Sequence, residues 1–123
     1  MRAKLLASTA AAVSLTLPAT AGAAYDYARF QSPTGNIRCA YRNQVGVGCI
    51  TLNNRLGVFL RSFGGARYLG AFELSIPAGP TLYYGQTWAV STFRCLSQST
   101  GMKCWSTLTG HGFFISRDTR RIY

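Results

Sequence analysis

Residues 37–51, which read IRCAYRNQVGVGCIT, carry the clearest structural signal in the sequence. Residues 93–106, which read FRCLSQSTGMKCWS, follow the same order. Each segment opens with an apolar residue, Arg and Cys, and then runs through a polar stretch to a Gly placed three positions before a second Cys. An apolar residue and a hydroxyl residue follow that second Cys. This order predicts two β-hairpins, each with a disulfide between its own strands.

The disulfide pairing follows from this repeat and not from spacing. Four cysteines allow three pairings, and spacing alone does not choose among them. The repeat favours Cys39–Cys49 and Cys95–Cys104, and loops this short contribute roughly 2–3 kcal/mol each by restricting the unfolded chain. The repeat is either a duplication or a coincidence in a chain rich in Gly and Ser, and both origins stay open. No zinc site is expected, because structural zinc sites favour cysteines about two to four residues apart.

Outside the two hairpins, short alternating runs predict further strands. Phe72, Leu74 and Ile76 alternate with smaller or polar residues over 71–76, as expected for a half-buried strand. Similar short candidates are residues 58–60, 88–91 and 113–115, and turn-forming residues separate them. No helical stripe is present outside the N-terminal segment. The pattern predicts an all-β fold, a small antiparallel sandwich or barrel with two disulfide-pinned hairpins.

The N-terminal segment has the order of a secretory signal peptide. A short basic start is followed by an uncharged run over 5–17, then by Pro18 and by small residues at 19–24. We expect a signal-peptide helix in residues 1–23, cleaved after Ala21 or after Ala23. The apolar run is too short to cross about 30 Å of hydrocarbon as a helix. No later segment is apolar enough to span a bilayer.

Length and charge then describe the mature chain. Of 123 residues, 13 are Lys or Arg, three are Asp or Glu and one is His, for a net charge of +10. Residues 24–123 are expected to form a single secreted β domain, and a net charge of about +8 remains after cleavage. Three carboxylates and one imidazole provide little material for acid–base or metal chemistry. We therefore expect no metal site and no cofactor.

Several motifs resemble those of a known protein family. Residues 30–39, FQSPTGNIRC, are similar to the opening of a family of small exported bacterial proteins that share an aromatic, Ser-Pro-Ser/Thr-Gly-Asn-Ile and a Cys. The second half resembles the same family, most clearly in residues 110–117, GHGFFISR. The resemblance weakens between Leu52 and Leu82. It implies export and paired cysteines, and it implies no established activity.

One enzymatic alternative uses the few groups that can transfer protons. A small basic ribonuclease would need a base, an acid and a cation, and Glu73, His111 and one of Arg94, Arg117 or Arg120 could supply them. The plainer interpretation of His111 is a turn residue that leads into the strand at 113–115. Cys49 loosely resembles the nucleophile of cell-wall transpeptidases, but a disulfide would abolish its reactivity.

The charge and aromatic content favour binding over catalysis. Arg is suited to bidentate contacts with carboxylates and phosphates, although the excess of Arg could also reflect base-composition bias. We expect a monomeric, non-enzymatic module that binds an anionic envelope polymer or an extracellular protein, without specific nucleic-acid recognition. An enzyme inhibitor that presents residues 77–80 is a further alternative. The candidate binding residues are Arg94, Arg117, Arg120, Arg121, Tyr83 and Tyr84.

Overall fold

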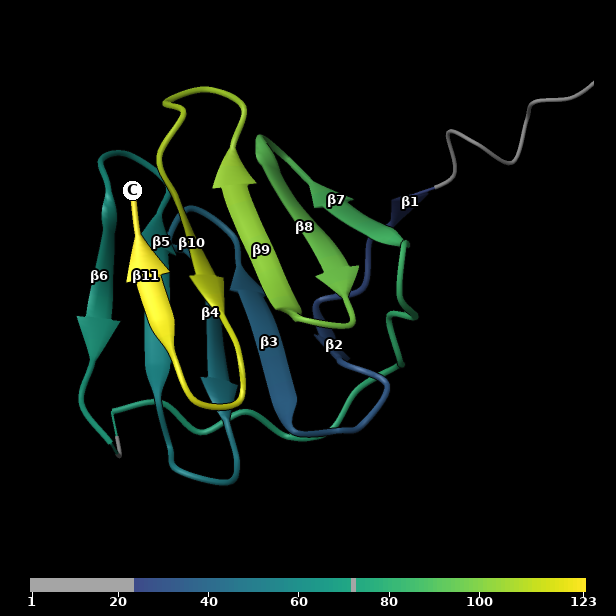
Figure 1. The fold of residues 1–123 in the computed structure, drawn as a ribbon. Coiled ribbons are helices and arrows are strands. Elements are labelled where there is room, and N and C mark those ends of the chain that lie inside the picture. Colours follow the sequence, from purple (N-terminus) through teal and green to yellow (C-terminus); the bar gives the residue numbers. More distant parts are fainter. Residues whose placement is uncertain (1–23, 72) are drawn as a thin grey trace, which may run out of the picture.

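Two β-sheets make up the part of the chain that the structure describes (Figure 1). The structure is a computed structural model that describes residues 24–71 and 73–123, and these residues form no helix. The five-stranded sheet has the order β2-β3-β4-β5-β6 and the six-stranded sheet the order β1-β7-β8-β9-β10-β11. All neighbouring strands are antiparallel except β1 and β7. The predicted all-β fold is confirmed.

The first sheet contains β2 (Arg29–Gln31), β3 (Ile37–Arg42), β4 (Gly46–Thr51), β5 (Gly57–Arg61) and β6 (Ala66–Leu69). The second contains β1 (Ala24–Tyr25), β7 (Thr87–Val90), β8 (Phe93–Gln98), β9 (Gly101–Ser106), β10 (Gly112–Ile115) and β11 (Arg120–Ile122). Buried side chains of both sheets form one hydrophobic cluster. The architecture is therefore a sandwich, and the predicted strands at 58–60, 88–91 and 113–115 correspond to β5, β7 and β10.

Both predicted disulfides are present. Cys39 pairs directly with Cys49 across β3 and β4, and Cys95 pairs with Cys104 across β8 and β9. All four cysteines are buried within the common core. Each disulfide therefore joins the two strands of one hairpin and faces the opposite sheet.

The two sheets are built in the same way. Each contains a run of five antiparallel strands in chain order, β2–β6 and β7–β11, with a disulfide between the second and third strands of the run. The loop from β4 to β5 and the loop from β9 to β10 both span five residues. In each loop the fourth residue adopts a left-handed conformation, Arg55 at φ 58° and Gly110 at φ 79°. This equivalence favours duplication of one unit over a coincidental repeat.

The predicted strand at 71–76 is wrong. Instead, the connection between β6 and β7 crosses the outer face of the first sheet as an extended strap, residues 73–80 (Figure 1). A Cβ added to Gly48 of β4 would lie 3.0 Å from Leu74, and the Arg38 guanidinium donates a hydrogen bond to the Ile76 carbonyl at 3.3 Å. Leu74 and Ile76 thus lie on top of a sheet and do not extend one. Phe72 lies outside the described residues.

The predicted signal peptide, residues 1–23, also lies outside the described residues. Within residues 24–71 and 73–123 there is no helix with the length and apolarity needed to cross a membrane.

Candidate functional site

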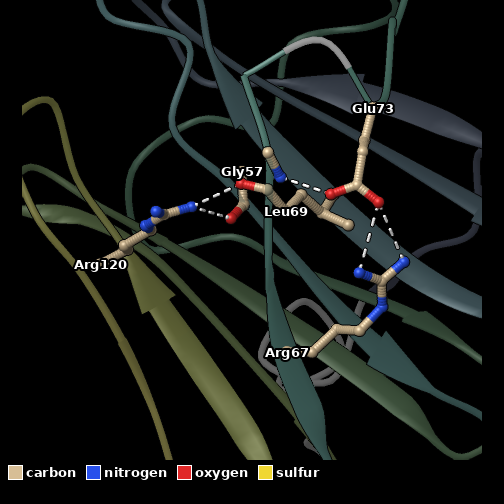
Figure 2. A network of polar contacts seen from close by, with 6 residues as sticks. Gly57, Arg67, Leu69, Glu73 and Arg120 are labelled. Atoms are coloured by element: carbon tan, nitrogen blue, oxygen red, sulfur yellow. Dashed lines mark hydrogen bonds and ion pairs between the residues drawn. The ribbon is translucent and has the colours of Figure 1, made fainter.

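Glu73, the carboxylate of the ribonuclease alternative, lies in the turn that follows β6 (Figure 2). It accepts a hydrogen bond from the Gly70 backbone N–H, and its Oε1 lies 3.4 Å from Nη2 of Arg67. The Gly70 hydrogen bond, aided by Arg67, lowers the pKa of Glu73 below its usual value, although partial desolvation opposes the shift. Glu73 is therefore an ionised residue that closes a turn.

His111 lies far from Glu73. A Cβ added to Gly65, just before β6, would lie 3.8 Å from the His111 ring, whereas Glu73 bonds Gly70, just after β6. Strand β6 separates these two points, and at about 3.3 Å per residue it keeps them roughly 15 Å apart. His111 is the last residue of the loop before β10, as its interpretation as a turn residue predicts. The structure thus does not assemble Glu73 and His111 into a proton-transfer pair.

The candidate arginines are divided among different places. Arg120 points inward, and its Nη1 donates to the carbonyls of Gly57 at 2.7 Å and Leu69 at 2.8 Å (Figure 2). It thereby links β11 of one sheet to β5 and β6 of the other. Arg94 donates to the carbonyls of Ser91 and Phe93 at the turn between β7 and β8. Arg120 is accordingly a structural residue.

The outer face of the second sheet brings cations and aromatic rings together. In β9 and β10, exposed or half-buried residues alternate with buried ones, which places the former on the outside of the sandwich. Arg94 of β8 pairs by register with Trp105, and Arg121 of β11 pairs with Phe114, so these cations lie on the same side of the sheet. The C-terminal ring of Tyr123 lies on that side as well. We call this surface the cationic face; its residues are Arg94, Lys103, Trp105, Phe114, Arg121 and Tyr123.

Contacts within the cationic face join each ring to a cation. The Arg121 guanidinium lies 4.9 Å from the centre of the Phe114 ring. Nζ of Lys103 lies 5.8 Å from the Trp105 ring and 5.9 Å from the Tyr123 ring, within the range of cation–π attraction. Burial raises the pKa of Tyr123 despite the opposing charge of Arg121, so its phenol stays neutral at neutral pH. Cations and rings therefore alternate over this surface.

The equivalent outer face of the first sheet is partly covered. By register, Gly48 and Ile50 occupy the positions that Lys103 and Trp105 hold in the second sheet. The strap covers them, because Leu74 packs against Gly48 and Ile76 accepts the hydrogen bond from Arg38. Two faces that are equivalent in topology thus differ in exposure. The strap covers part of the first face, whose exposed end carries Arg61 and Arg67, whereas the second face presents Lys103 and Arg121 to solvent.

A separate polar cavity lies at one end of the sandwich, between loops of both sheets. Its volume is about 590 Å³, within the range of about 300–1,000 Å³ that is common for small-molecule sites. We call it the end cleft. Most of its lining residues carry a hydroxyl, an amide or a charge: Ser32, Thr34, Asn36, Asn53, Tyr84, Gln98, Ser99, Thr100, Ser116, Arg117 and Asp118.

The segment SPTGN, residues 32–36, forms one wall of the end cleft. Oγ of Ser32 accepts a hydrogen bond from the Ile37 N–H, and Gly35 adopts the left-handed conformation that the turn requires. Oδ1 of Asn36 accepts from the Asn53 N–H at 3.0 Å, and the Asn53 amide donates to the Arg117 carbonyl at 3.2 Å. Three loops that are distant in the sequence are thus tied into one frame.

The remaining candidates are Tyr83, Tyr84 and the segment 77–80. Tyr84 lines the end cleft together with Arg117, whereas Tyr83 is exposed and does not line it. Residues 77–80 lie against β2, where the Gln31 N–H donates to the Pro80 carbonyl and a Cβ on Gly79 would lie 2.9 Å from the Arg29 backbone. This segment does not have the geometry of a projecting inhibitor loop.

Sequence analysis missed several members of both sites. Alternation could have identified Lys103 and Trp105, which lie on the same side of one predicted hairpin strand. It could also have identified Phe114 as the outward residue of the strand at 113–115. No sequence pattern could have identified Asp118 and Gln98, because only the arrangement of the loops brings them to the end cleft.

Comparisons with known proteins identify no relative: no protein-family model, no curated protein and no solved structure matches this chain. Among the described residues, no group of three or more His, Cys, Asp or Glu side chains is placed to hold a metal ion.

Proposed function

We propose that this protein is a secreted, non-enzymatic binding module whose cationic face binds an anionic polymer of the cell envelope. The observation that carries the proposal is the contact of two exposed cations, Lys103 and Arg121, with three aromatic rings on one sheet face. Secretion is supported by the two disulfides, which form and persist in oxidising compartments.

Two cations of this face, Lys103 and Arg121, are exposed and available for a ligand. The ion pair of Arg67 and Glu73 lies on the first sheet and its following turn, and no ion pair among the described residues involves Lys103 or Arg121. A polyanion that contacts these side chains releases condensed counterions, which favours binding at low salt. Rings beside the cations add contact area at little conformational cost. The face is thus suited to a repeating anionic chain more than to one buried ligand.

The test is binding of the purified mature protein to immobilised poly(glycerol phosphate) at increasing salt. We expect the double variant Lys103→Gln/Arg121→Gln to bind about tenfold more weakly, which corresponds to about 1.4 kcal/mol. The matched control is Arg42→Gln/Arg61→Gln, which removes two exposed charges at the ends of β3 and β5 on the other sheet. We expect that control to change affinity less than threefold, since it lowers only the net charge.

Three results would contradict the proposal. Equal losses in the two double variants would show that net charge alone drives binding. Retention that survives molar salt would exclude a mechanism based on exposed charges, because salt of that strength screens them within about 3 Å. Cleavage of RNA by the protein, abolished by His111→Ala, would favour the ribonuclease alternative instead.

A further inference from the structure

We infer that the end cleft is a second binding site, and that it takes an uncharged ring of a carbohydrate. This inference is independent of the proposed function, because the cleft lies between loops at the end of the sandwich and shares no residue with the cationic face. The argument depends on three properties of the cleft: its fixed walls, its unused polar groups and its balance of charge.

The walls of the end cleft are held before any ligand arrives. The loop at 32–36 is closed by a hydrogen bond from the Gly35 N–H to the Ser32 carbonyl, at 2.8 Å. The Leu52 N–H donates to the Asn36 carbonyl at 2.8 Å, and the Asn54 amide donates to the Arg117 carbonyl at 3.1 Å. A site that is already ordered loses little conformational freedom when it binds, so weak individual contacts suffice.

Inside this frame, several polar side chains have no partner. Within residues 24–71 and 73–123, no hydrogen bond or ion pair engages the Arg117 guanidinium, the Asp118 carboxylate or the Gln98 side-chain amide. These groups, with the hydroxyls of Ser99 and Thr100, line the same cavity. Together they offer both donors and acceptors, and a ligand that meets them must provide both.

The charge balance of the end cleft favours neither an anion nor a cation. Arg117 and Asp118 are its two charged lining residues, and they are of opposite sign. An anion would be attracted by the guanidinium but repelled by the carboxylate, and the reverse holds for a cation, whereas an apolar ligand would leave both groups desolvated and unpaired. Sugar hydroxyls both donate and accept, so they can satisfy the two groups at once.

Tyr84 completes the match to a sugar ring. Its side chain is 49% exposed and lines the end cleft, so part of its ring is free to contact a ligand. A sugar has polar edges and an apolar face of C–H groups, and an aromatic ring can cover that face while the edges meet the polar walls. The carbohydrate ring is therefore the ligand class that uses every part of the lining.

The experiment is a titration of the isotopically labelled mature protein with three uncharged tetrasaccharides, cellotetraose, chitotetraose and maltotetraose, followed by NMR. We expect at least one of them to shift the backbone amide signals of Gln98, Thr100 and Asp118 at millimolar concentration. The binding should be unchanged in 0.5 M salt, in contrast to polyanion binding, which is strongly salt-dependent.

Variants test whether Tyr84 and Asp118 contact the sugar. We expect Tyr84→Ala and Asp118→Asn each to weaken binding about fivefold or more, since each removes a direct contact. The matched control is Tyr83→Ala, the neighbouring exposed tyrosine outside the end cleft. Lys103→Gln/Arg121→Gln provides a second control that should leave sugar binding unchanged even if it abolishes polyanion binding.

The inference is overturned if none of the three tetrasaccharides at about 10 mM, a generous excess for weak sites, shifts the amide signals of the end cleft. It is equally overturned if Tyr83→Ala weakens binding as much as Tyr84→Ala does. Shifts of these signals by alanine or by poly(glycerol phosphate), without any response to sugars, would assign the cleft to a zwitterion or to the polyanion instead.

Discussion

Phe30 and Trp88 pack against each other at the centre of the sandwich, with ring centres 5.0 Å apart. Phe30 of β2 lies directly opposite Cys39 of β3, and Trp88 of β7 lies directly opposite Cys95 of β8. By register, the two aromatic residues therefore hold equivalent positions in the two sheets and meet between them. One layer of the core thus contains two disulfides and two large rings, all buried.

Removal of either disulfide should destabilise the protein by a similar amount. The closed loops differ by one residue, with sequence separations of 10 and 9. The chain-entropy model then gives a loss of about 2.5–3 kcal/mol for Cys39→Ala/Cys49→Ala and for Cys95→Ala/Cys104→Ala. Urea denaturation of the two double variants measures the change. A loss below about 1 kcal/mol in one variant only would show that the two sheets do not contribute alike.

Arg120 and Arg121 are adjacent in the chain but should contribute differently to stability. Arg120→Gln removes a charged donor from the carbonyls of Gly57 and Leu69, and we expect it to lower the free energy of unfolding by about 1.5–3 kcal/mol. Arg121→Gln should change stability by less than about 0.5 kcal/mol, because its guanidinium lies on the exposed face. Thermal unfolding of both variants provides the comparison. Equal effects would contradict the structural role of Arg120.

Gly110 is required for its backbone conformation and not for space. It adopts φ 79°, and no atom outside its neighbours lies within 4 Å of a Cβ placed there. Gly110→Ala should therefore cost about 1–2 kcal/mol through backbone strain alone. Gly110→Asn is the control, and it should cost less, since Asn tolerates the left-handed region better. Identical unfolding midpoints for Ala and Asn would refute this explanation.

Ser97 carries a buried hydroxyl without a partner. Its side chain is fully buried in β8, and no described residue hydrogen-bonds its Oγ. Burial of an unpaired hydroxyl costs about 1–3 kcal/mol, so Ser97→Ala should raise the free energy of unfolding by about 1 kcal/mol. Chemical denaturation tests this expectation, and Ser106→Ala is the contrast. The Ser106 hydroxyl accepts from two backbone N–H groups, so that substitution should be destabilising.

Glu73 should make folding sensitive to acid. Its pKa is lowered in the folded protein, chiefly by the Gly70 N–H and next by Arg67. The folded state therefore holds this proton less tightly than the unfolded state does. Its contribution to stability is present above the ordinary carboxyl pKa near 4.5 and is lost as the pH falls through the lowered pKa.

An NMR titration of the Glu73 side chain should show this lowered pKa. In Arg67→Gln it should move only part of the way back, because the Gly70 hydrogen bond has the larger effect. The control is Arg121→Gln, which should leave the Glu73 pKa unchanged. A complete return to the ordinary value in Arg67→Gln would mean that charge, and not the backbone hydrogen bond, is the dominant cause.

The strands that sequence analysis recognised were those with strong local patterns. Strand β10 was recognised because Phe113 and Ile115 are buried apolar residues in a short run. Strands β2, β6 and β11 were missed, since they have three or four residues and contain exposed arginines such as Arg67 and Arg121. Such short strands form because a neighbouring strand supplies hydrogen bonds, which depends on a partner distant in the chain.

The error at residues 71–76 has a different cause. Leu74 and Ile76 do alternate with exposed residues, as in a half-buried strand. The period of two reports that one side of an extended chain is apolar, and it does not report whether that chain pairs within a sheet or lies across one. Here the apolar side lies on the first sheet, against Gly48.

Local patterns in the amino-acid sequence were enough to predict the all-β class and the two hairpins with their disulfides, because alternation, turn residues and short cysteine loops act over neighbouring positions. The packing of distant segments was needed to show which sheet face the strap covers, that Arg120 is internal while Arg121 is exposed, and that Tyr84, Gln98 and Asp118 line one cleft. These arrangements depend on which segments pack together after the two sheets meet, and no local pattern encodes that contact.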